Sequence, residues 1–431
     1  PIEKEGDEVK AKELRKIIHV AIPENSNVLF GPSHAKEFVG SLLPAESTVI
    51  AEAKAAPTST PTHVLMLSLT DEMSDIYNEL TNLRIDLNSS TRIYVVTMSR
   101  MWSRMRNRIY GLPRNSNINN WIPPNEITNI FEQTGYEIVQ QRNAVLVPFR
   151  IPLISQLANR WLSQMPILRH FSLFNIITIR PKLRDLNRGS KVSVIVAARN
   201  EAGNIHSLIS RLPSLSAAQE LIFVEGGSND STWETIQSAM DQNSDNSKLT
   251  ISAYKQTGKG KGDAVRLGFS KATGDILIIL DADLSVPPEE LRRFIENLKN
   301  DNCEFANGSR LVYPMEDKAM QFLNLVGNRL FGMSFSFLIG QSVRDTLCGT
   351  KAMWADDYRR LAAQREYFGD FDPFGDFDLL FGASRLGLRI RDIPVHYKER
   401  VYGSTNISRF RHGLLLIKMT MFAAKRLKFV K

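Results

Sequence analysis

Cysteine is scarce in this chain of 431 residues, which contains only Cys303 and Cys348. Two cysteines cannot build a disulfide scaffold or a four-cysteine zinc site, so we expect a reduced, cytosolic compartment. Uninterrupted apolar runs of about 20 residues are also missing, which argues against a membrane-spanning helix. The seven histidines show no metal-ligand spacing.

The composition is that of a globular protein, with 43% hydrophobic and 23% charged residues. At roughly 150 residues per domain, the length predicts two or three domains. The net charge of +8 favours partners that carry phosphate, in nucleic acid, nucleotides or lipid head groups. The basic residues are not interleaved with aromatic residues in a recognised module, so we expect no nucleic-acid partner.

Short apolar runs in the first half predict a small α/β sheet. A helix is expected over 125–131 and a strand over 137–139. Over 151–180 the apolar residues are spaced by three and four positions, which predicts a helical connector. The polar stretch 181–190 marks the expected domain boundary. The apolar runs are 27–30, 48–51, 64–67 and 93–96.

The second half predicts strands and helices in alternation, beginning with the strand 192–196. Such a β-α-β-α order indicates a mostly parallel sheet covered by helices on both faces. The further strands are expected at 221–224, 249–253 and 275–280, and the helices at 233–240, 262–272 and 288–298.

Two acidic residues, Asp281 and Asp283, follow directly after the apolar strand that ends at Leu280. Residues i and i+2 of an extended chain point to one face, and ligands of α/β sheets bind at the carboxyl ends of the strands. Such a pair can hold Mg²⁺ or Mn²⁺, which prefer oxygen ligands and bridge a diphosphate. The alternative is a solvated turn that carries two aspartates by chance.

Three more polar segments, 196–201, 224–232 and 258–263, lie at successive strand ends, where one nucleotide could touch all of them. In order along the chain stand A-A-R-N-E, E-G-G-S-x-D, G-K-G, D-A-D-L, G-S-R and V-Y-G-S-T-N. With these motifs the chain resembles, over about residues 190–415, the family 2 glycosyltransferases of the GT-A fold. Among them it is most similar to the dolichyl-phosphate mannosyltransferase group.

The resemblance implies a role for each matching residue. Asp281 and Asp283 of the D-x-D motif would be the metal ligands and act in catalysis. Glu225 and Gly226 stand where the family has two aspartates, so the donor stays open between UDP-linked and GDP-linked sugars. The donor would be bound by Ala197, Arg199, Glu201, Glu225, Asp230, Lys261 and Asp281, and the acceptor by Ser309, Arg310, Arg344, Arg400 and Ser404.

The acceptor class depends on whether a general base is needed. A phosphate monoester has a second pKa near about 6 and attacks without a base, so the arginines favour a polyprenyl phosphate. A saccharide hydroxyl needs a base, for which Asp376 and Asp378 are the candidates; helix capping is their alternative role. The third possibility is a non-catalytic scaffold.

The last segment, 409–431, alternates apolar runs with seven basic residues and contains no acid. It predicts a basic amphipathic helix on an anionic membrane surface, peripheral to the cytosolic face. The alternative is a helix that docks on its own domain.

The first half is similar to a class I S-adenosylmethionine methyltransferase that has lost its site. The similarity rests on 121–127 and on 135–139, and the strand 27–30 is followed by a single glycine, Gly31. A glycine-rich loop is needed there for close approach of the cofactor, so we expect no methyl transfer.

The expected organisation is therefore α/β throughout, with a GT-A, Rossmann-like domain and a smaller Rossmann-like domain before it. The boundaries are 1–150 for the degenerate methyltransferase-like domain, 151–190 for an amphipathic helical connector, 191–408 for the glycosyltransferase domain and 409–431 for the C-terminal helix.

Overall fold

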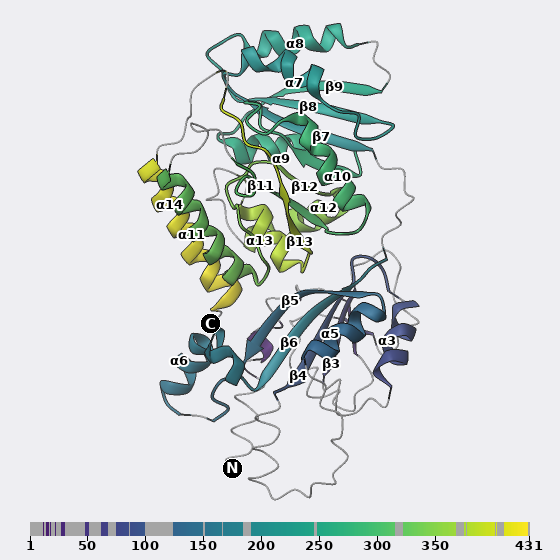
Figure 1. Ribbon diagram of the computed structural model, residues 1–431, viewed down its shortest axis with the longest axis vertical. Helices are drawn as coiled ribbons and strands as arrows, with labels where there is room; N and C mark the ends of the chain where they lie inside the picture. The colour runs from purple at the N-terminus through teal and green to yellow at the C-terminus, as the bar shows by residue number, and fades with distance from the viewer. Residues whose placement is uncertain are drawn as a thin grey trace, which may run out of the picture. The chain divides into compact units, whose positions relative to one another are not determined.

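The chain divides into two compact units in the computed structural model, and each is described by itself (Figure 1). One unit comprises residues 1–184 together with 424–431, and the other comprises residues 185–423. The described residues are 12, 14–16, 18, 22, 27–30, 48–50, 62–67, 75–85, 87–99, 124–149, 151–165, 167–183, 191–244, 248–314, 322–367, 375, 377–400, 402 and 409–429.

The N-terminal unit contains a six-stranded sheet in the order β2-β1-β3-β4-β6-β5. Its first four strands are parallel, and β6 is inserted antiparallel between β4 and β5. Ile93, Phe131 and Ile179 form part of its apolar core. The strands are β1 (Asn27–Phe30), β2 (Thr48–Ile50), β3 (Thr62–Leu67), β4 (Arg92–Met98), β5 (Tyr136–Ala144) and β6 (Phe174–Pro181), with helices α3 (Ile76–Ile85) and α5 (Pro124–Gln133).

The prediction of a helical connector over 151–190 was wrong in its second half. Only α6 (Ile154–Arg160) and the short 3₁₀ helices η2 (Leu162–Gln164) and η3 (Leu168–Phe171) are helical, and β6 follows them. Ile176, Ile177 and Ile179 belong to a β-branched run, which favours an extended chain. The connector therefore supplies a strand to the N-terminal sheet.

The C-terminal unit contains a seven-stranded sheet in the order β13-β11-β12-β10-β7-β8-β9. All neighbouring strands are parallel except β12, which is antiparallel to both of its neighbours. The expected α/β class with a mostly parallel sheet is confirmed. The strands are β7 (Val192–Ala198), β8 (Gln219–Glu225), β9 (Leu249–Lys255), β10 (Ile276–Ile279), β11 (Phe305–Ser309), β12 (Lys351–Trp354) and β13 (Ile390–Pro394).

Helices follow most of these strands. They are η4 (Ala202–Asn204), α7 (Ile205–Arg211), α8 (Thr232–Gln242), α9 (Lys261–Lys271), η5 (Pro288–Glu290), α10 (Leu291–Lys299), α11 (Phe322–Ile339), α12 (Ala355–Ala363), η6 (Arg365–Tyr367), α13 (Phe377–Arg385) and α14 (Arg409–Ala423).

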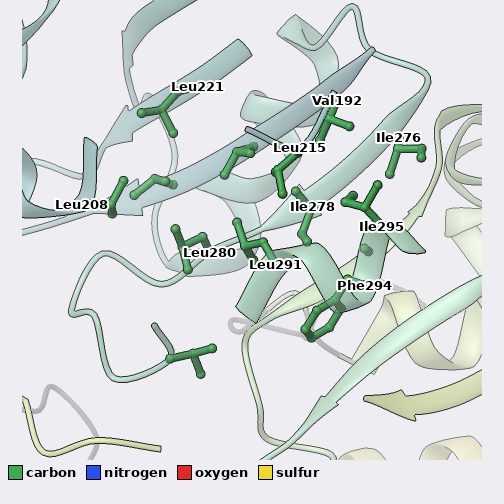
Figure 2. Packing of buried hydrophobic residues seen from close by; sticks show 14 of the residues in the cluster. Val192, Leu208, Leu215, Leu221, Ile276, Ile278, Leu280, Leu291, Phe294 and Ile295 are labelled. Atoms are coloured by element: carbon green, nitrogen blue, oxygen red, sulfur yellow. The ribbon is translucent and has the colours of Figure 1, made fainter. Parts of the chain in front are cut away.

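The core of this unit is formed by the central strands together with helices α7, α8 and α10 (Figure 2). Ile276 and Ile278 of β10 belong to the same buried cluster as Leu291, Phe294 and Ile295 on the apolar face of α10. That face follows the i, i+3, i+4 pattern of an amphipathic helix. Because β7, β8 and β10 are parallel neighbours, the polar segments that follow them meet at one edge of the sheet.

The segment predicted as a helix over 409–431 is helical without a break from Arg409 to Lys428. Helix α14 ends at Ala423 and the π-helix η7 (Ala424–Lys428) follows, at the point where the chain passes from one unit to the other. Within its own unit, α14 packs against α11 and buries Leu416 and Met419.

Candidate active site

The two aspartates that follow β10 each pair with a cation. Lys261, the first residue of α9, places its Nζ 2.5 Å from Asp281 Oδ1, and Arg400 pairs with Asp283 Oδ2. Burial acts to raise the pKa of Asp281, but the neighbouring Lys261, helped by Lys351 and Arg310, holds this pKa below its usual value. The Asp281 carboxylate is thus stabilised as an anion.

A third carboxylate, Glu201, lies within electrostatic reach of this pair. Its pKa is raised to about 7, first by burial and then by the charges of Asp283 and Asp281, against the opposing effects of Asn204 and Arg400. The loop after β7 therefore shares one electrostatic environment with the loop after β10, as the sequence predicts.

The residues present fit a divalent cation that is shared with a diphosphate. In the part of the chain that the structure describes, no group of three or more His, Cys, Asp or Glu side chains is arranged to hold a metal by itself. Mg²⁺ and Mn²⁺ in nucleotide enzymes bind one or two carboxylates and complete their coordination with substrate phosphates and water. Asp281 and Asp283 supply that number of carboxylates.

The loop that contains Gly349 can approach the Lys261–Asp281 ion pair closely because glycine has no side chain. A Cβ atom at this position would overlap with Lys261 Nζ and with Asp281 Oδ2. The absence of a side chain therefore lets the backbone of 344–351 come within contact distance of the Lys261–Asp281 ion pair.

Asp230, predicted to bind the donor, holds two loops together. Its Oδ1 accepts a hydrogen bond from the N–H of Thr232 (3.1 Å), and its Oδ2 accepts from the N–H of Ala202 (3.3 Å) and from the Tyr402 hydroxyl (3.3 Å). These donors outweigh desolvation and lower the pKa of Asp230. The contacts indicate a positioning role, and its donor contact stays a prediction.

The other predicted donor residues lie at the same edge. Glu225 ends β8, is buried, and accepts a hydrogen bond from the N–H of Ser228 at 2.5 Å. Ala197 is partly exposed near the end of β7, and Arg199 is exposed just beyond it.

On the acceptor side, Arg310 is clamped by Asp345, which the sequence did not single out. Arg310 Nε and Nη2 lie 2.7 and 2.9 Å from the two Asp345 oxygens, and its guanidinium stands 4.9 Å from the ring centroid of Tyr397. Asn328 of α11 donates to the same carboxylate at 2.7 Å. The charge of Arg310 lowers the pKa of Asp345 to about 2 although burial opposes it.

The structure describes three of the four remaining acceptor candidates. Ser309 ends β11 and is fully buried, whereas Arg344 is exposed and its N–H donates to Asp392 Oδ2 at 2.7 Å. Arg400 lies at the Asp283 carboxylate instead. Ser404 is outside the described residues.

Only one of the two candidate bases, Asp378, can be described, because Asp376 lies outside the described residues. Asp378, in the first turn of α13, is buried; its Oδ1 accepts the N–H of Leu379 (2.9 Å). Its Oδ2 lies 3.8 Å from Arg266 Nη1 and 3.8 Å from Arg365 Nε. These contacts resemble those of a residue that anchors a helix.

Sequence reasoning missed Asp345, Tyr397 and Tyr402 as parts of the site. Asp345 stands next to Arg344 in the segment that the family resemblance assigns to the acceptor side, and this was the only signal. Tyr402 stands in the V-Y-G-S-T-N motif, but its contact with Asp230 joins residues 172 positions apart. The contact of Tyr397 with Arg310 is also tertiary, and no local pattern reveals such contacts.

The middle of the chain is similar in sequence to a known protein family. Residues 193–361 match the profile of the family described as Glycosyl transferase family 2. Over these residues the chain is similar to the family 2 glycosyltransferases. The matched segment includes Asp281, Asp283, Lys261 and Arg310. The likeness of the N-terminal unit to a methyltransferase is not part of this match and stays a prediction.

Two curated relatives act on polyprenyl phosphates according to their names. A dolichol-phosphate mannosyltransferase of Pyrococcus furiosus is 38% identical over 125 residues, which cover 28% of this chain and 34% of the relative. An undecaprenyl-phosphate 4-deoxy-4-formamido-L-arabinose transferase of Yersinia pestis is 26% identical over 226 residues, covering 51% of this chain and 64% of the relative. The chain thus spans between a third and two thirds of these relatives.

Among solved structures, a glucosyl-3-phosphoglycerate synthase of Mycobacterium tuberculosis in complex with Mn²⁺, UDP and glucosyl-3-phosphoglycerate is similar with a TM-score of 0.41 and 17% identity. The match covers 58% of this chain and 87% of that one.

Proposed function

We propose that the C-terminal unit is a metal-dependent, inverting glycosyltransferase that moves a sugar from a nucleoside diphosphate to a polyprenyl phosphate. The observation that carries this proposal is the carboxylate pair Asp281 and Asp283 at the end of β10, balanced by Lys261 and Arg400. The names of the two curated relatives support the acceptor class.

On the donor side, Asp281 and Asp283 would hold Mg²⁺ or Mn²⁺, which supplies charge neutralisation for the departing diphosphate. Lys261 and Arg400 are positioned to turn from these carboxylates toward the phosphates of the donor. Asp230 keeps the loops after β7 and β8 together, so that the nucleotide meets a preformed edge. UDP-linked and GDP-linked sugars both remain candidates.

On the acceptor side, Arg310 is fixed in direction by Asp345 and by the Tyr397 ring. A guanidinium held in this way offers its remaining N–H groups to phosphate oxygens in a planar fork. Since a phosphate monoester is already dianionic at neutral pH, the attack on the anomeric carbon requires no protein base. The contacts of Asp378 with two arginines support this choice over a hydroxyl acceptor.

A position at the membrane surface, on the cytosolic side, is part of the proposal. Helix α14 exposes Leu414, Ile417 and Met421 on the side away from its buried residues, and α11 beside it exposes Leu330 and Met333. Among the described residues, none of the helices has the length and apolar character needed to span a bilayer. An acceptor with a lipid tail would meet the domain at such a face.

The test begins with thermal melting in the presence of UDP or GDP, with and without Mn²⁺. A ligand at about 100 times its dissociation constant should stabilise the fold by roughly 2.7 kcal/mol. We expect a Mn²⁺-dependent shift with one nucleotide and its loss in Asp283→Asn. Transfer from the matching sugar nucleotides to a short-chain polyprenyl phosphate is then measured.

Two variants separate the acceptor classes. Asp378→Asn should leave the chemical step nearly unchanged with a lipid phosphate, whereas a hydroxyl acceptor predicts a rate loss of roughly 10²–10⁴-fold on removal of its base; Asp376→Asn is measured in parallel. If no nucleotide shifts the melting temperature and no sugar is transferred, the non-catalytic scaffold takes the place of this proposal.

For the N-terminal unit we propose a degenerate methyltransferase-like domain without methyl transfer. The parallel strands β1 to β4, with β6 inserted antiparallel beside them, support a Rossmann-like origin. Isothermal calorimetry should give no heat of S-adenosylmethionine binding, and a measurable affinity would contradict the loss of the site.

A further inference from the structure

The helical segment 154–171 that precedes β6 buries polar side chains and exposes apolar ones. The residues that α6 and η2 bury include Ser155, Asn159, Ser163 and Gln164. Asn159 exchanges two hydrogen bonds with the backbone of Val147, at 2.7 and 2.9 Å. Polar side chains thus tie the segment to its own unit, where an amphipathic helix would normally place apolar ones.

The apolar side chains of the same segment face outward. Leu153 is 74% exposed and Ile167 78% exposed, and Leu153 has a backbone φ of 64°, which is unfavourable for a leucine. We call the outward set the 151–167 surface. Its main members are Leu153, Ile154, Leu157, Trp161, Met165 and Ile167.

Basic residues surround this surface and acidic residues are missing from its sequence. Trp161 stacks on Phe429 with 4.4 Å between the ring centroids, and Arg160 Nε donates to the Phe429 carbonyl at 3.3 Å, so the C-terminal residues lie beside α6 (Figure 1). Arg169, Lys425 and Arg426 are exposed. Neither 138–184 nor 400–431 contains Asp or Glu.

The like charges in this region act on one another. The pKa of Lys428 is lowered to about 7, first by burial and then by the charges of Arg142 and Arg169. Arg142, which is itself buried, also donates to the Leu427 carbonyl at 3.2 Å. The exposed cations of this region are Arg169, Lys425 and Arg426. A cluster of this kind gains free energy when an anionic surface supplies the opposite charge.

From this combination we infer that the 151–167 surface is a membrane-docking site of the N-terminal unit, which inserts its apolar side chains among the lipids of an anionic bilayer while the adjoining cations bind phosphate head groups. Outward apolar residues flanked by cations fit the boundary between acyl chains and head groups. A protein partner would not require an acid-free border on both segments. The inference does not depend on the transfer reaction or on α14.

The experiment is flotation of the full chain with vesicles of neutral lipid and with vesicles that contain about 30% phosphatidylserine. We expect binding to the anionic vesicles, weakened in about 0.5 M NaCl. Leu153→Ser/Leu157→Ser/Ile167→Ser should lower the partition coefficient at least about tenfold. The matched control is Tyr77→Ser/Val312→Ser, which removes exposed apolar side chains elsewhere and should bind like the wild type.

A second comparison separates this surface from the face of α14. If Leu414→Ser/Ile417→Ser/Met421→Ser abolishes binding while the 151–167 variant binds normally, the inference is overturned. It is also overturned if the wild type does not bind anionic vesicles. The same holds if the 151–167 variant binds vesicles like the wild type and differs only in its oligomeric state in solution. A single cysteine introduced as Ile167→Cys can be labelled selectively with an environment-sensitive dye, because the two native cysteines are buried. Its emission should shift to shorter wavelength when anionic vesicles are added.

Discussion

At the scale of single residues, the buried Asp345 connects the loop that follows β11 with helix α11. It accepts hydrogen bonds from Arg310, from Asn328 and from the N–H of Leu347. Removing one partner of a buried ion pair leaves the other uncompensated, which typically destabilises by about 3–5 kcal/mol. We therefore expect Asp345→Asn to lower the free energy of unfolding by that order, measured by denaturant titration.

The control is Asp356→Asn, which breaks an exposed pair with Arg359 and should change stability by no more than about 1 kcal/mol. The dependence of the free energy of unfolding on pH provides a further check of this contribution. The pKa of Asp345 is about 2 in the folded chain against 3.8 unfolded, so its contribution is present above the higher value and is lost as the pH falls through the lower one. Wild type and Asp345→Asn should converge in stability over that window.

Gly349 offers a test of the carboxylate site that removes no charged group. In Gly349→Ala the new methyl group would displace Lys261 or Asp281, so the nucleotide- and Mn²⁺-dependent melting shift should be reduced or lost. Gly327→Ala is the matched control, because a Cβ there meets nothing within 4 Å and alanine favours a helix. An unchanged shift in Gly349→Ala would show that the close approach of this loop is not needed for binding.

The sequence predicts which charged residues belong to the site, but it does not predict which of them pair with one another. Asp281, Asp283, Lys261 and Arg310 follow apolar strands or lie in ordered motifs, so their place at the sheet edge follows from chain direction alone. The clamp between Arg310 and Asp345 joins residues 35 positions apart, and its geometry depends on how β11 and α11 pack.

At the scale of secondary-structure elements, the contact between α9 and β7 depends on the absence of a side chain at Gly268. A Cβ there would overlap with Ile195 Cγ2. Overpacking of this kind typically costs about 1–3 kcal/mol, so Gly268→Ala should lower the free energy of unfolding by that amount. Because Ile195→Ala makes room, the double variant should be more stable than the sum of the two single effects predicts; strict additivity would contradict the contact.

Most strands could be predicted because they are short apolar runs between turns. The strands at 27–30 and 276–279 coincide with runs recognised in the sequence. Residues 174–181 were misassigned because three- and four-residue spacing in 154–167 was extended across a β-branched run. The spacing did mark a helical segment, but it could not reveal that this segment buries its polar side.

At the scale of the whole molecule, each unit has a core of its own. We expect differential scanning calorimetry to resolve two transitions, since separate cores need not melt together. The nucleotide that binds with Mn²⁺ should raise only the transition of the unit formed by 185–423, by mass action on its folded state. A single transition that moves as a whole would contradict independent units.

The ion pair between Asp345 and Arg310 also restricts which substitutions this sequence can accept during evolution. Exchange of Asp345 alone leaves a guanidinium without its counter-ion, and exchange of Arg310 alone leaves a buried carboxylate, so each intermediate is less fit than either end point. The two positions are therefore expected to change together or not at all among descendants of this chain. Asn328, hydrogen-bonded to the same carboxylate, should change with them, so that three positions in two loops and a helix are expected to covary.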